Sequence, residues 1–109
     1  MAMTTTYSKP EPARLVIDQL PGSVLLEFGT PWCGWCMAAQ APIAQAMNAY
    51  PDVQHMKIED GKGQPLGRSF RVKLWPTLVF LRDGREVARL VRPADATAIS
   101  RALADLGSA

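Results

Sequence analysis

Cys33 and Cys36 are the residues whose types and spacing most directly suggest chemistry; they are the only cysteines of this 109-residue chain. The apolar run 24–28 before them is typical of a buried strand, and residues 37–41 after them are good helix formers. A thiol at a helix start lies among unpaired backbone N–H groups and at the positive end of the helix dipole, which favours the thiolate. The second thiol lies within the first helical turn, close enough to form a disulfide. The pair therefore predicts a reversible dithiol/disulfide couple.

Glu27 is a carboxylate that interrupts the apolar run before the cysteines. We expect it to point into the interior behind the cysteine pair. Burial makes an ionised carboxylate costly and raises its pKa, which suits a group that takes a proton from Cys36. A glutamate on a solvent-facing strand is the alternative that the sequence leaves open.

The remaining pattern predicts the elements that must position these groups. We expect helices over 12–20, 34–50, 66–70 and 95–106, and strands over 23–29, 53–59, 77–82 and 85–91. Asp83-Gly84 is a strong hairpin signal between the last two strands, and Asp95 is suited to cap the final helix. The polar, proline-punctuated residues 1–12 predict a flexible N-terminal arm, and residues 13–109 a single domain.

Two separated motifs carry a resemblance to a known family. Pro31-Trp32-Cys33-Gly34-Trp35-Cys36 follows a strand, and Trp75-Pro76-Thr77 opens another strand 39 positions after Cys36. Together they resemble the active-site segments of the thioredoxin superfamily, and the resemblance covers residues 16–106. It implies an α/β thioredoxin fold, a mixed central β-sheet flanked by helices on both faces.

The resemblance also implies roles for the reactive residues. Cys33 becomes the nucleophile and Cys36 the resolving thiol, which attacks the mixed disulfide between Cys33 and the substrate. Glu27 matches a family carboxylate that accepts a proton. The redox-active Cys33–Cys36 disulfide is then the reactive group, and no separate cofactor is expected.

His55 is the only histidine, and in the resemblance it stands where the family often has a lysine that pairs with the buried carboxylate. A histidine there would make proton transfer pH-sensitive near neutrality. Lys57 in the same role, or an exposed strand histidine, are the alternatives that remain open.

A docking surface for substrate is expected around the disulfide. In the family, a cis-proline packs against the disulfide and the residue before it pairs with substrate backbone, which here are Pro76 and Trp75. A core role for Trp75 is the alternative. We assign substrate binding to six residues: Trp32, Gly34, Trp35, Leu74, Trp75 and Pro76.

The resemblance predicts a thiol–disulfide oxidoreductase that reduces protein disulfides. Its partners would be client proteins with disulfides and an upstream electron donor of the thioredoxin-reductase type. Gly34-Trp35 differs from the Gly-Pro of thioredoxins and the Gly-His of disulfide isomerases. A disulfide isomerase or oxidase of an exported compartment, or a non-catalytic interaction module with this fold, therefore remain alternatives.

Composition and charge argue against several other classes of protein. A hydrophobic fraction of 48%, a charged fraction of 20% and a net charge of +2 are ordinary for a small globular domain, here expected to be a monomer. No basic cluster suggests nucleic acid, and no apolar stretch could span a membrane. One Cys-x-x-Cys motif supplies two of the four ligands of a structural zinc site, so we expect no metal unless a dimer shares one. The N-terminus does not resemble a signal peptide, which predicts a cytoplasmic location, or a periplasmic one if a leader has been removed.

Overall fold

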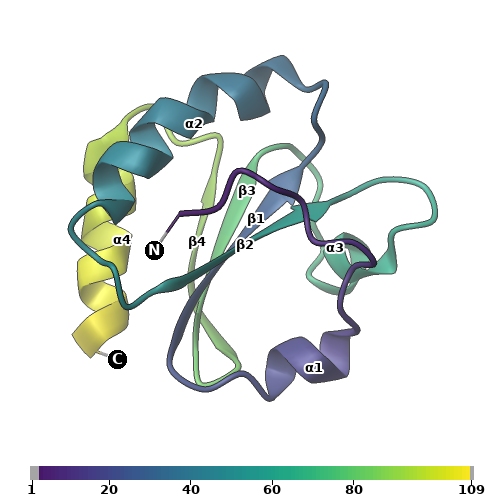
Figure 1. Cartoon of the computed structure of the whole chain (residues 1–109), viewed down its shortest axis with the longest axis horizontal. Coiled ribbons are helices and arrows are strands. Elements are labelled where there is room, and N and C mark those ends of the chain that lie inside the picture. The colour runs from purple at the N-terminus through teal and green to yellow at the C-terminus, as the bar shows by residue number, and fades with distance from the viewer. Residues whose placement is uncertain (1–2, 109) are drawn as a thin grey trace.

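The computed structural model describes residues 3–108, and a four-stranded mixed sheet forms its centre (Figure 1). The spatial order is β2–β1–β3–β4, in which β1 and β2 are parallel and the other neighbours are antiparallel. The strands are β1 (Ser23–Gly29), β2 (Gln54–Glu59), β3 (Thr77–Arg82) and β4 (Arg85–Val91). This arrangement confirms the predicted mixed sheet.

Helices cover both faces of the sheet, as the resemblance implies (Figure 1). One core cluster joins alternate residues of β1 and β3 to α2 (Gly34–Met47) and α4 (Ala96–Ser108). The other joins the opposite strand residues to α1 (Arg14–Asp18) and α3 (Pro65–Ser69). Because strand side chains alternate between faces, β1 contributes Leu25 to the first cluster and Leu26 to the second.

The connection from β1 to the parallel strand β2 runs through α2, so the two cysteines lie where β1 ends and α2 begins. Gly29, the last residue of β1, approaches this helix closely. A Cβ atom at Gly29 would collide with the Cys36 Sγ atom, so only glycine fits without a shift. The predicted cap of α4 is confirmed, because Asp95 Oδ1 accepts a hydrogen bond from the Thr97 N–H at 3.0 Å.

Some helix ends differ from the sequence prediction. Helix α1 begins at Arg14 rather than at residue 12, because Ala13 before it is extended with ψ of 152°. Helix α2 ends at Met47, three residues before the predicted end at Tyr50. Pro51 follows Tyr50, and a residue before proline is disfavoured in the helical conformation.

The N-terminal segment lies along the free edge of β2 (Figure 1). Tyr7 forms a parallel bridge with Lys57, and the Ser8 N–H donates to the Lys57 carbonyl at 2.8 Å. Further along, the Glu11 carboxylate accepts from the Leu66 N–H at 2.9 Å. Through these contacts the segment lies against the domain. Residues 1 and 2 of the predicted arm lie outside the described residues.

Candidate functional site

Cys33 is the N-cap residue of α2, with an extended backbone (φ −80°, ψ 121°). Its Sγ atom accepts a hydrogen bond from the Cys36 N–H at 3.2 Å. This N–H is one of the helix donors that have no carbonyl partner within the helix. The contact and the helix dipole both favour negative charge on the Cys33 sulfur. The position is the one that the sequence predicts for the reactive thiol.

Cys36 is the more deeply buried thiol, with 2% of its surface exposed against 7% for Cys33. Burial and the side-chain hydrogen bond with Cys33 raise the pKa of Cys36 to about 12. The Cys36 thiol is therefore protonated at neutral pH and needs a proton acceptor before it can attack a disulfide. Both cysteines are buried, Cys36 more deeply than Cys33.

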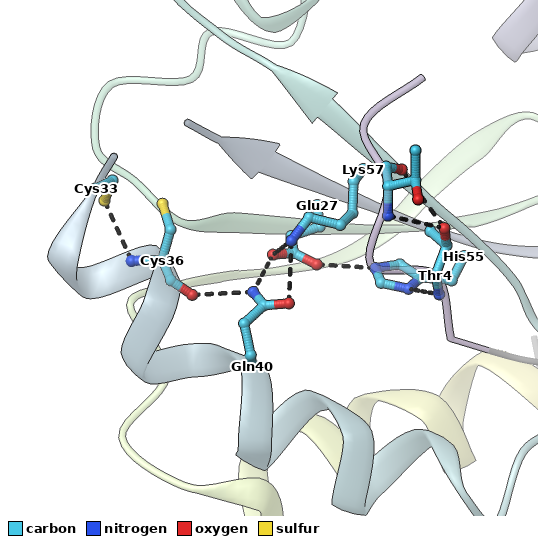
Figure 2. A network of polar contacts seen from close by, with 8 residues as sticks. Thr4, Glu27, Cys33, Cys36, Gln40, His55 and Lys57 are labelled. Atoms are coloured by element: carbon cyan, nitrogen blue, oxygen red, sulfur yellow. Dashed lines mark hydrogen bonds and ion pairs between the residues drawn. The ribbon is translucent and has the colours of Figure 1, made fainter. Parts of the chain in front are cut away.

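Glu27 lies behind Cys36 with 1% of its surface exposed, so the prediction of an inward-pointing carboxylate is confirmed and the solvent-facing alternative is wrong (Figure 2). Its Oε1 atom is 2.9 Å from His55 Nε2. Its Oε2 atom accepts from Gln40 Nε2 at 2.8 Å and lies 3.5 Å from Lys57 Nζ. Three side chains from β2 and α2 therefore surround one carboxylate.

The predicted direction of the Glu27 pKa shift is wrong. Burial does raise the pKa of this carboxyl, as expected. The hydrogen bonds from His55 and Gln40 and the positive charge of Lys57 outweigh that effect and lower it below its usual value. Glu27 is therefore ionised at neutral pH, before any proton leaves Cys36.

The sequence left open whether His55 or Lys57 is the partner of the buried carboxylate. In the structure both side chains contact it. In the sheet, Lys57 is paired directly with Glu27, and His55 lies two residues earlier on the same face of β2. His55 is 7% exposed, which excludes the exposed-histidine alternative.

The N-terminal segment fixes the protonation pattern of the His55 ring (Figure 2). The Thr4 backbone N–H donates to His55 Nδ1 at 3.0 Å. Because an N–H group can only donate, Nδ1 must be the acceptor nitrogen. In this neutral tautomer the proton is on Nε2, which donates to Glu27. A backbone group 51 residues away in sequence therefore determines how His55 meets the carboxylate.

Gln40 is a site residue that the sequence interpretation missed. Its amide nitrogen donates to Glu27 and also to the Cys36 carbonyl at 2.9 Å, while its amide oxygen accepts from Lys57 Nζ at 3.0 Å. It therefore links the first turn of α2 to the buried charges (Figure 2). The available signal was its spacing: a residue four after Cys36 lies on the same helix face.

A pocket of about 290 Å³ lies beside Cys36 and reaches the buried charges. Its lining includes Tyr7, Thr30, Gln40 and Lys57. Tyr7 comes from the N-terminal segment, and the Lys57 ammonium is 4.8 Å from its ring centroid. Burial, together with the charges of Cys36 and Glu27, raises the pKa of Tyr7, so its hydroxyl stays neutral. No pattern in the sequence predicts that this segment lines the pocket beside Cys36.

Aromatic side chains form an exposed rim on the outer side of the cysteines. Trp32 and Trp35 are 70% and 60% exposed, and Leu74 is 49% exposed. Trp75 is half-buried: its ring meets the Trp32 ring edge to face, with centroids 5.6 Å apart. A pure core role for Trp75 is therefore wrong.

The motif Trp75-Pro76-Thr77 is held in place beside this rim by a hydrogen bond. The Trp75 indole N–H donates to the Asp60 carboxylate at 2.8 Å, so the loop before α3 supports the ring. The Trp75–Pro76 peptide bond is cis. Gly34, the first residue of α2, has open space where a side chain would begin.

Within residues 3–108, no three histidine, cysteine or acidic side chains gather in a way that could hold a metal ion. None of the helices in that range is long and apolar enough to span a bilayer.

Comparison with known proteins gives consistent matches. The sequence profile of the Thioredoxin family matches residues 11–105. The reduced form of thioredoxin 2 from Pseudomonas aeruginosa PAO1 has a TM-score of 0.87 at 57% identity, covering 97% of this chain and 98% of that one.

Curated relatives are more distant in sequence. Mitochondrial Thioredoxin-3 of Saccharomyces cerevisiae is 28% identical over 83 residues, which cover 76% of this chain and 65% of the relative. Thioredoxin-2 of Pyricularia oryzae is 29% identical over 68 residues, covering 62% of this chain and 40% of the relative. This chain thus spans less than two thirds of the length of these two relatives.

The lowered pKa of Glu27 predicts a pH-dependent stability difference between the native chain and Glu27→Gln. A group whose pKa is lower in the folded state than the roughly 4.3 of the unfolded chain stabilises the fold above that pH. The contribution is lost as the pH falls through the folded pKa. At pH 7 we expect the free energy of unfolding of Glu27→Gln to be about 3 kcal/mol lower than that of the native chain, because Lys57 loses its buried partner.

Urea denaturation at pH 7 and at pH 3 to 4 measures this difference. We expect it to shrink progressively as the pH falls below the roughly 4.3 of the unfolded carboxyl and toward the lower pKa that Glu27 has in the folded state. A difference that is as large at pH 3 as at pH 7 would contradict the ionised carboxylate.

The Thr4 contact predicts the tautomer of His55. Thr4→Pro removes the backbone N–H that donates to Nδ1, whereas Thr4→Ala keeps it and serves as the matched control. In ¹⁵N spectra at pH 7, the native chain and Thr4→Ala should show the proton on Nε2. Thr4→Pro should show proton occupancy at Nδ1 as well. An unchanged His55 ring spectrum in Thr4→Pro would show that Thr4 does not fix the tautomer.

Proposed function

The chain belongs to the thioredoxin family, and we propose that it reduces protein disulfides through the Cys33–Cys36 couple. Members of this family are thiol–disulfide oxidoreductases that use no cofactor beyond the redox-active disulfide. The observation that carries the proposal is the contrast between the two thiols. Cys33, which is 7% exposed, accepts a hydrogen bond from a helix N–H, and the more deeply buried Cys36 is protonated near an ionised carboxylate.

The reaction proceeds in two exchange steps. The Cys33 thiolate attacks one sulfur of a client disulfide, which breaks the client S–S bond and releases one client thiolate. The Cys36 thiolate then attacks Cys33 Sγ in the mixed disulfide and releases the second client thiolate. Two electrons pass to the client, whose two sulfurs end as thiols, and Cys33 and Cys36 end as a disulfide.

The mixed disulfide prepares Cys36 for the second step. The hydrogen bond and the charge of Cys33 are two of the influences that raise the pKa of Cys36. Both are removed when the Cys33 sulfur becomes part of a neutral disulfide, so the Cys36 proton becomes easier to remove. Its proposed acceptor is the ionised carboxylate of Glu27 behind it, whose partners Gln40 and Lys57 line the pocket beside Cys36.

The aromatic rim is the proposed client surface. Exposed tryptophans are unusual on a small domain and mark surfaces that bind peptides. The proposed client surface comprises the rim residues Trp32, Trp35, Leu74 and Trp75 together with Gly34 and the buried Pro76. Gly34 adds no side chain to obstruct an incoming sulfur. His55 acts indirectly, as the residue that positions the Glu27 carboxylate.

Family membership supports the remaining proposals. Thioredoxins act on disulfide substrates and are reduced by thioredoxin reductase, so an enzyme of that type is the proposed electron donor. We retain the cytoplasm as the proposed location and a monomer as the proposed state. The ionised state of Glu27 gives no reason to prefer a disulfide isomerase or oxidase to a disulfide reductase.

Single cysteine substitutions test the proposal on insulin or a small peptide disulfide. Cys36→Ala should accumulate a mixed disulfide through Cys33, because the second attack is missing. Cys33→Ala should accumulate little, because the remaining Cys36 thiol is buried and protonated. Non-reducing electrophoresis and peptide mass spectrometry identify the linked cysteine.

The native chain is the control and should turn over the same disulfide when a chemical reductant regenerates it. Trapping through Cys36 instead of Cys33 would reverse the assigned roles. The absence of both trapping and turnover would indicate a non-catalytic interaction module.

A further inference from the structure

Arg92 lies next to the proposed client surface, at the point where the chain leaves β4. Its backbone N–H donates to the Pro76 carbonyl at 2.9 Å. Its backbone is in the left-handed region, with φ of 49°, and Pro93 follows it. The residue is half-buried, so its backbone contact and its burial fix where the side chain begins.

The Arg92 side chain reaches the aromatic rim. Its Nε atom donates to the Trp75 carbonyl at 2.8 Å. The centre of its guanidinium group lies 4.7 Å from the centroid of the Trp35 ring. Arg92 therefore contacts both segments that surround the cysteines, the turn between them and the loop that carries Pro76.

The charge of Arg92 has no acidic partner among residues 3–108. Of the ion pairs among residues 3–108, none includes Arg92. Asp60 accepts from the Trp75 indole, and Asp95, three residues after Arg92, caps α4. The two terminal amino groups of the guanidinium make none of the protein hydrogen bonds identified in this range, and they remain available to a ligand.

A pocket of about 190 Å³ lies against this cation. Its lining includes Trp35, Pro42, Pro76 and Pro93 beside Arg92. These walls are largely apolar ring surfaces. A side chain with a short aliphatic stem and a terminal carboxylate fits both features, because the stem packs on the rings and the carboxylate meets the guanidinium.

We propose that Arg92 is a specificity-determining residue that selects client disulfides with an acidic side chain beside the reacting cysteine. This inference rests on the proposed reductase function, since it names the class of client for the same site. The planar guanidinium presents its free N–H groups as a fork that matches a carboxylate. Stacking on Trp35 holds that fork in place before the client arrives.

Two peptide disulfides test the proposal, one with Glu and one with Gln next to the attacked cysteine. For the native chain at low salt, we expect kcat/KM to be about three- to fivefold higher for the Glu peptide, as for a favourable exposed or half-exposed ion pair. High salt should reduce this ratio because it screens the charge. Arg92→Gln should bring the ratio close to one.

Two further variants separate charge from structure. Arg92→Lys keeps the charge without the planar group and should retain part of the preference. Arg85→Gln makes the same change in net charge at the other end of β4, about 23 Å away along the strand, and should keep the full ratio. Arg85 is exposed and outside the proposed site.

A binding measurement keeps the inference testable even if the peptides are not reduced. In Cys33→Ala/Cys36→Ala, peptide titration followed by tryptophan fluorescence should give a lower Kd for the Glu peptide. Adding Arg92→Gln should remove that difference. An unchanged ratio in Arg92→Gln, or equal loss in Arg92→Gln and Arg92→Lys, would overturn selection by charge. Failure to reduce either peptide would instead count against the proposed function, and the Kd ratio would still decide the role of Arg92.

Discussion

An ionised carboxylate buried behind a protonated thiol is the constraint on which the rest of this structure depends. Glu27 cannot remain charged in the interior without partners, because burial strongly disfavours an isolated charge. The fold supplies those partners from different elements: β2 places His55 and Lys57 on the same face, and α2 contributes Gln40. The N-terminal segment completes the arrangement through its contact with His55. Local structure around the cysteines therefore depends on contacts made by distant parts of the chain.

The same arrangement gives the two thiols unequal properties. The end of β1 and the start of α2 bring Cys33 to unpaired helix donors, while the close approach of Gly29 accommodates Cys36 in the interior. Cys33 can then react with a client beside the rim. Cys36 reacts only after formation of the mixed disulfide has removed the negative charge of Cys33. The interior side of the site governs the removal of the proton from Cys36. The solvent side governs which client proteins bind. Arg92 belongs to the second side, because it contacts both rim segments without reaching the buried network.

The local parts of this account could be predicted from the sequence. The Cys-x-x-Cys spacing, the apolar strand before it and Asp83-Gly84 are short-range patterns, and the elements that they predict are present. Inward placement of Glu27 followed from its position in an apolar run. The direction of its pKa shift did not follow, because that direction depends on how many donors the other elements bring. Gln40 and Arg92 were missed for the same reason: each is an ordinary polar residue whose role comes only from what lies opposite it in space. The contacts of Thr4 and Tyr7 were hidden because proline-rich polar segments resemble free arms whether or not an edge strand binds them.

The most direct test of the central claim is the reduction potential of the Cys33–Cys36 couple, measured against a glutathione or dithiothreitol series. Tryptophan fluorescence can report the redox state, because Trp32 and Trp35 adjoin the two cysteines in sequence. A reductase of this family should give a potential near the roughly −270 mV of thioredoxin. A potential of about −180 mV or higher would indicate an isomerase or oxidant. The absence of any redox transition would contradict the oxidoreductase account altogether.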